Sequence, residues 1–184
     1  MSTPLIVLIV VVLVLVWMYN SLVSKKNQVT NIFASVDTLL KKRYNLIPNL
    51  VASVSKYMEH EKSLLQEVTK LRSDANRPHI SDEQKIALDA KVSSALGSIM
   101  IAVENYPELK ANENVMHLQH SLNEIEEQIS AARRAYNQAV TDYNNAIEMI
   151  PTNFMASAMN YKPKEVFEIQ ESERKNVNVK ELFS

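Results

Sequence analysis

The feature that most constrains this chain is an uninterrupted apolar run near its start, from Leu5 to Met18. The helical segment extends from Pro4 to Val23, and at about 1.5 Å per residue it crosses a hydrocarbon core of about 30 Å. Trp17 and Tyr19 suit an interfacial aromatic belt. A cleaved signal peptide is the main alternative, but no Lys or Arg precedes the run and no small-residue cleavage motif follows it. We therefore expect residues 1–24 to form a transmembrane anchor.

The charges that flank the apolar run predict its orientation. Lys25 and Lys26 follow it, and Lys41–Arg43 come next, whereas only the α-amine precedes it. Because positively charged flanks stay inside, we expect a single-pass protein of the cell membrane with its N-terminus outside and the remaining chain in the cytoplasm. The alternative is a domain on the outer side of the membrane that acts in envelope maintenance.

The rest of the chain is poor in turn-forming and reactive residues, with one glycine and no cysteine among 184 residues. This composition favours long helices over β-structure. It excludes disulfides, cysteine nucleophiles, thiolate zinc sites and Gly-rich phosphate loops. No nucleophile elbow is present either. We therefore expect an all-α protein that is not an enzyme and has no catalytic residues, cofactor or metal.

Apolar residues recur at sevenfold spacing after the anchor and predict a long first helix. The two series are Val29, Val36, Leu50, Tyr57, Leu64, Leu71 and Phe33, Leu40, Ile47, Val54, Val68, Ala75. Such spacing places one continuous apolar stripe on a helix. We expect one helix from Lys25 to about Asn76, with a kink near Tyr44 because Pro48 removes a backbone donor.

Two further long helices are predicted beyond a turn at residues 77–79. Ser81 and Gln84 form a capping-box pattern, so a second helix should cover Asp82–Asn105. A third should run from about Asn112 to Ile150, where Pro151 stops it. Its stripe contains Val115, Leu122, Ile129, Tyr136 and Tyr143.

The expected architecture is therefore an antiparallel bundle of three long helices over residues 25–162, completed by a short C-terminal helix. Phe154, Ala158 and Tyr161 would place that short helix against the bundle. Residues 163–184 should form a polar, mobile tail, because Glu165 to Ser184 is rich in charge.

The unequal helix lengths predict a partner. In such a bundle the stripe from Val29 to Ile47 has no cover, and neither do Tyr143 and Ile150. Long exposed apolar stripes usually mark interfaces. We therefore expect a homo-oligomer or a helical protein partner, unless Pro48 folds the first segment back.

Four motifs in this order resemble the LemA family. They are LLKKRYNLIPNLV at Leu39–Val51, YMEHE at Tyr57–Glu61, ENYPELKANE at Glu104–Glu113 and ARRAYNQAVTDY at Ala132–Tyr143. The resemblance implies a membrane-anchored helical bundle with the short N-terminus outside and no established enzymatic activity. One branch of the family is associated with magnetosome membranes, which leaves membrane organisation open as a role. Asn160 stands where the family often has glycine, and asparagine tolerates the positive φ of such a turn.

Arg43 and Glu61 are the charged residues at otherwise apolar sevenfold positions. Each should pair with an opposite charge from another helix or subunit, or else bind a partner or ligand. They cannot pair with each other, being about 27 Å apart along one helix. Lys41 and Lys42 could contact anionic headgroups, or simply lie in solvent. We expect no nucleic acid, because aromatic residues are not interleaved with a broad basic face.

A metal-binding protein is the remaining alternative. His117 and His120 lie one turn apart, with Glu113 and Glu124 one turn to either side. Any solvated helix face gives the same spacing, and we expect His60 to be solvated or hydrogen-bonded as well. The sequence therefore predicts a membrane-anchored helical scaffold or interaction protein, in contact with membrane lipid.

Overall fold

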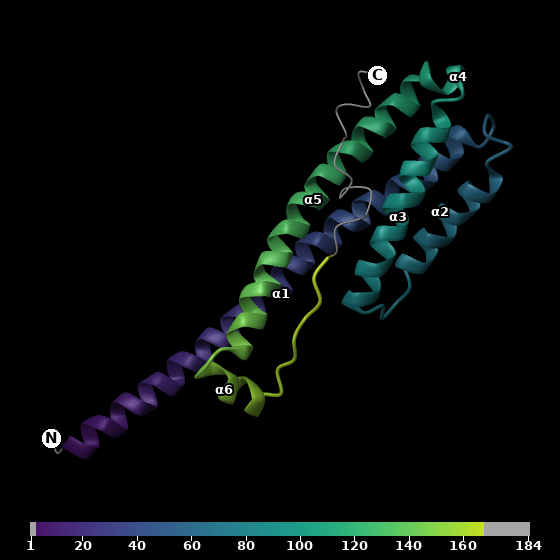
Figure 1. Cartoon of the computed structure of the whole chain (residues 1–184). Helices are drawn as coiled ribbons and strands as arrows, with labels where there is room; N and C mark the ends of the chain where they lie inside the picture. Colours follow the sequence, from purple (N-terminus) through teal and green to yellow (C-terminus); the bar gives the residue numbers. More distant parts are fainter. Residues whose placement is uncertain (1–2, 168–184) are drawn as a thin grey trace, which may run out of the picture.

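The computed structural model describes residues 3–167, and this part of the chain is all-α, as predicted. The helices are α1 (Thr3–Val54), α2 (Lys62–Ala75), α3 (Asp82–Val103), α4 (Pro107–Lys110), α5 (Glu113–Glu148) and α6 (Thr152–Ala158). Figure 1 shows α1 as a long axis whose N-terminal part projects alone. α5 lies along the rest of α1, while α2 and α3 pack only at the end far from the N-terminus.

The core is a seam between α1 and α5, which run antiparallel. From α1 it contains Leu22, Val29, Val36, Leu40 and Ile47, and from α5 Leu122, Ile129, Tyr136, Val140 and Tyr143, all buried. The stripe from Val29 to Ile47 is therefore covered by α5, and Tyr143 of α5 is covered in turn: Val36 is 0% exposed and Tyr143 is 3% exposed. Ile150 alone of these residues is exposed as expected, at 78%. The long stripe on α1 thus gives no reason for a partner, and the partner itself stays a prediction.

The prediction of one helix from Lys25 to about Asn76 is wrong. α1 ends at Val54. The chain then reverses and α2 returns along α1, as the hydrogen bond from Arg72 Nε to the Tyr44 carbonyl shows. No glycine or proline marks the reversal. Contacts with other elements hold it instead, since Met58 lies in the core at 1% exposure. The sevenfold pattern continues through the break, and for this reason it could not reveal the turn.

Pro48 neither ends α1 nor folds it back, because the helix continues six residues beyond it. A proline in a helix leaves the carbonyl four residues earlier without its usual donor. Here that carbonyl belongs to Tyr44, and it accepts a hydrogen bond from Arg72 Nε at 3.0 Å. α2 therefore supplies the bond that Pro48 removes.

This arrangement makes the effect of Arg72 depend on Pro48. Arg72→Met is expected to lower the free energy of unfolding by about 1–3 kcal/mol, because a buried carbonyl loses its donor. In a Pro48→Ala chain the new backbone N–H satisfies that carbonyl, so the same change at Arg72 should cost clearly less. Chemical denaturation of the four proteins in detergent measures the difference. An equal cost in both backgrounds would contradict this role of Arg72.

The predicted starts of the two later helices are confirmed. Gln84 N–H donates to the Ser81 hydroxyl at 3.2 Å, and the Gln84 side chain accepts from Ser81 N–H at 3.1 Å. Asn112 caps α5 by accepting from the backbone N–H of Asn114 and Val115. The sequence did not predict α4. Asn160 has φ 52°, which confirms the turn expected at this position.

The chain after α6 departs from the polar tail that the sequence predicts, as far as Phe167. It runs extended back along α5, as the yellow segment of Figure 1 shows. Asn144 both donates to and accepts from the Lys164 backbone, and Asn137 does the same with Phe167. Phe167 is buried against the ring of Tyr136. Residues 168–184 of the predicted tail lie outside the described part.

Candidate functional site

Arg43 lies at the centre of a charge cluster that joins three helices. Its Nη1 donates to Glu126 of α5 and to Ser93 of α3, both at 2.7 Å. Its Nη2 donates to Asp89 of α3. Arg133 of α5 closes the cluster, because its Nη2 lies 2.5 Å from Asp89 and its Nη1 lies 3.4 Å from Glu126. Two cations and two carboxylates therefore face one another.

The cluster is withdrawn from water at its centre. Arg43 and Asp89 are each 1% exposed, whereas Glu126 lies at the edge with 39% of its side chain exposed. Burial alone lowers the pKa of Arg43, but Asp89 and Glu126 more than offset this, so the pKa is raised above its ordinary value. Burial also raises the pKa of neighbouring Tyr44 to about 12, despite the cation beside it.

The charge cluster is better suited to holding α1, α3 and α5 together than to binding or transforming a ligand. Both guanidinium groups are neutralised by carboxylates of the cluster, and the buried charges would be costly if one partner were lost. Two cavities flank the cluster, one of about 240 Å³ beside Ser93 and Glu126 and one of about 560 Å³ beside Asp89 and Arg133. The second is bordered by the extended segment that ends at Phe167.

The other three candidate residues do not join this cluster. Glu61 precedes α2 and accepts a hydrogen bond from the Tyr106 hydroxyl at 2.6 Å, which raises the pKa of Tyr106. The partner that the structure gives Glu61 is thus a neutral hydroxyl rather than the expected cation. Lys41 and Lys42 are exposed on α1, about 35 Å along the helix from Met18. Because α1 does not fold back, the structure gives no support for contact between these lysines and lipid headgroups.

The histidines of the metal alternative lie on the surface of α5. His117 and His120 are both exposed, and His120 Nδ1 lies 3.7 Å from Glu124. Within residues 3–167, no three His, Asp or Glu side chains form a group that could hold a metal ion.

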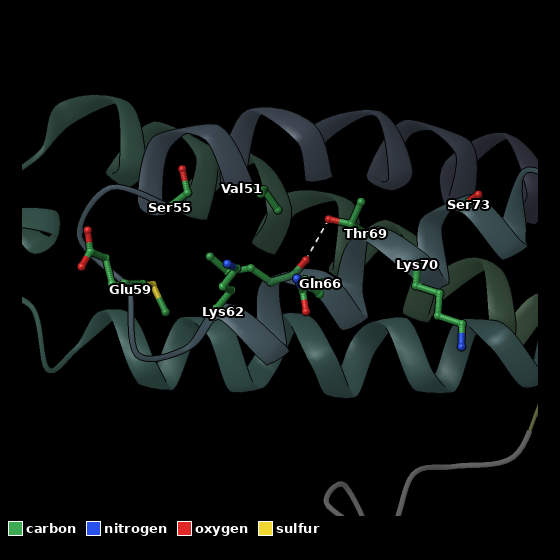
Figure 2. A pocket seen from close by; sticks show the side chains of 10 residues that line it. Val51, Ser55, Glu59, Lys62, Gln66, Thr69, Lys70 and Ser73 are labelled. Carbon is green, nitrogen blue, oxygen red and sulfur yellow. Dashed lines mark hydrogen bonds between the residues drawn. The ribbon is translucent and has the colours of Figure 1, made fainter.

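A surface depression of about 860 Å³ lies between the end of α1 and α2. Figure 2 shows Val51 of α1 pointing toward Thr69 and Gln66 of α2, with Ser55 just beyond the end of α1. The lining is mixed, with apolar side chains and both charge signs, and no group of catalytic residues converges there. As an open groove on the surface, it suits contact with another macromolecule better than enclosure of a small substrate.

Two described helices, α1 and α3, are long and apolar enough to cross a membrane. In α3 one face packs into the bundle, where Val92, Ile99 and Val103 are buried, although Ile101 on another face is 69% exposed. In α1, by contrast, every residue from Leu5 to Trp17 is between 40% and 68% exposed. The N-terminal apolar helix therefore has the properties of a membrane anchor.

Sequence reasoning missed the partners of Arg43. Asp89 lies seven residues before Leu96 and fourteen before Val103, both buried, so the sevenfold pattern of α3 could have placed it on the seam. Glu126 and Arg133 are also seven residues apart, but each follows a residue of the apolar stripe, Ile125 and Ala132 respectively, instead of lying in it. Only the long arginine stem brings Arg133 to Asp89, and spacing alone does not indicate this.

Comparison with known proteins agrees with the motifs. The LemA family profile matches residues 32–180. Protein LemA of Metamycoplasma hominis is 25% identical over 163 residues, which cover 89% of this chain and 74% of that protein. Magnetosome protein MamQ 2 of Paramagnetospirillum magneticum is 34% identical over 83 residues, and Magnetosome protein MamQ of Magnetospirillum gryphiswaldense is 30% identical over 82 residues.

Each MamQ match covers 45% of this chain and only 30% of the relative's own length. The names of these relatives describe no reaction. The family profile, however, covers most of the sequence and includes all four motifs. The chain belongs to the LemA family.

Proposed function

We propose that this protein is a single-pass membrane scaffold with its N-terminus outside and its bundle in the cytoplasm. It holds the end of the bundle formed by α1, α2, α3 and α5 away from the bilayer, where a protein partner binds it. The scaffold works by placement rather than by catalysis.

One observation carries this proposal: α1 runs without a break from the apolar segment into the far end of the bundle. A membrane anchor joined by a flexible linker would leave the bundle free to tumble. Here the same helix serves both parts, and from Met18 to Val54 it extends about 54 Å. The charge cluster around Arg43 fixes α3 and α5 to this axis. The far end therefore keeps a set distance from the anchor.

The charge pattern supports the cytoplasmic side. Lys25 and Lys26 lie directly after the apolar segment. The Lys26 ammonium lies 4.9 Å from the ring centroid of Tyr161, the residue before Lys162. All three cations are at the bundle end of the anchor, and positive residues are retained inside. Relatives named magnetosome proteins are consistent with a role in organising a membrane.

Site-specific photocrosslinking in intact cells tests the partner. A photoreactive residue is placed in the full chain at exposed positions of the far end, namely Gln66, Lys91 or Glu127. At least one position should give a discrete protein adduct, with a second copy of the chain or with another protein. The matched control at Leu8, on the exposed apolar segment, should give lipid adducts instead. Absence of protein adducts from all three far-end positions would overturn the proposal.

A further inference from the structure

We infer that the corner between α5 and α6, residues 149–161, is a second membrane contact that lies in the interfacial layer of the bilayer that holds α1. This inference rests on the proposed anchor. In this inference the exposed side chains of the corner contact lipid rather than solvent or another protein.

The antiparallel register places the corner beside the end of the apolar segment. Glu126 of α5 pairs with Arg43 of α1, and the Tyr136 ring packs on Phe33 with centroids 5.4 Å apart. Equal numbers of residues separate these partners on the two helices, so the register is constant. Continued to the end of α5, it brings Glu148 level with Ser21, and residues 149–161 follow directly. α6 contacts α1, and Met18 and Leu22 are the first buried residues along α1.

The length of the uncovered apolar helix requires the bilayer to reach this corner. From Pro4 to Trp17 the helix is exposed all round and extends only about 21 Å. The hydrocarbon core is about 30 Å thick. The remaining part of the span is the stretch from Met18 to Val23, and this stretch is the one packed against the corner. A membrane that covers the whole apolar segment therefore also meets α6.

The surface of the corner suits lipid. Met149 is 63% exposed, Ile150 is 78% exposed and Phe154 is 71% exposed. Residues 149–161 include no charged side chain. The Thr152 hydroxyl lies 2.6 Å from the Ala146 carbonyl and 2.9 Å from that of Met149, so carbonyls at the end of α5 have a partner other than water.

Cations border the corner on the side away from the anchor. Lys26 and Lys162 are exposed, and Lys25 is half-buried. Basic residues at this depth meet the anionic headgroups of the inner leaflet. Apolar side chains facing the acyl boundary with basic residues one layer above them are the pattern of interfacial helices.

Lipid-depth quenching with the full chain in vesicles tests the inference. The chain has no cysteine, so single cysteines can replace Met149 or Phe154 and carry an environment-sensitive fluorophore. Vesicles contain zwitterionic and anionic lipids with a spin-labelled quencher. Ala135 is the matched control, exposed on α5 and about 21 Å along this helix from its C-cap residue Met149. A label at Leu13 reports on the anchor itself.

We expect quenching by lipid at Met149 and Phe154 to be several-fold stronger than at Ala135, with a blue-shifted emission. Labels at the corner that match Ala135 while Leu13 is quenched would overturn this inference and leave the anchor intact. Loss of quenching at Leu13 as well would overturn the anchor too. Shielding from water without quenching by lipid would show that protein covers the corner, which also contradicts the inference.

Discussion

Asp89→Asn is expected to lower the free energy of unfolding by about 3–5 kcal/mol. Asp89 is buried and faces both Arg43 and Arg133, so the neutral amide leaves two guanidinium groups with one carboxylate between them. Removing one partner of a buried ion pair leaves a charge that neither water nor protein compensates. For a chain of this size the melting temperature should fall on the order of 10 °C. Circular dichroism of the full chain in detergent measures it.

Two companion variants separate pairing from general disturbance. Glu127→Gln changes an exposed carboxylate next to Glu126 and should alter stability by no more than about 0.5 kcal/mol. Arg43→Met combined with Asp89→Leu removes both buried charges and should be clearly more stable than Asp89→Asn alone. The account is contradicted if Asp89→Asn melts like the wild-type chain, or if the double variant is the least stable of all.

Ile129→Asp should destabilise the chain by at least about 4 kcal/mol. Ile129 is 0% exposed in the seam between α1 and α5. The change removes an apolar side chain that fills the seam, which costs about 2–5 kcal/mol by itself. It also buries a carboxylate among the apolar side chains of the core. The expected result in a thermal melt is a bundle that unfolds well below the wild-type temperature.

Gln128→Asp is the matched control, because it places the same residue one position away on the exposed face of α5. It should melt close to the wild-type chain. Ile129→Ala should lie between the two, since it creates a cavity without a charge. Wild-type melting of the Ile129→Asp chain would mean that this stripe is not the core.

Local signals predicted much of this fold. Ser81 with Gln84 and Asn112 mark helix starts through hydrogen bonds to neighbouring backbone groups, and these depend only on nearby residues. The seam position of Arg43 also follows from its spacing. Such signals are readable because the atoms concerned are close in sequence.

The reversal after Val54 could not be read in the same way. Met58 and Glu61 hold it through contacts with the core and with Tyr106, which lies far along the chain. The apolar spacing is the same before and after the turn, so it predicts a single helix. Likewise, Phe167 is one aromatic residue in a charged segment, and only the position of Tyr136 and Asn137 makes it a core residue.

The topology of the chain tests the central claim most directly. A reporter that is active only in the cytoplasm, and one that is active only after export, are each fused to the C-terminus of the full chain. Because Lys25 and Lys26 follow an otherwise uncharged anchor, the cytoplasmic reporter should be active and the export reporter inactive. The opposite pattern would place the bundle outside and contradict a scaffold on the inner face of the membrane.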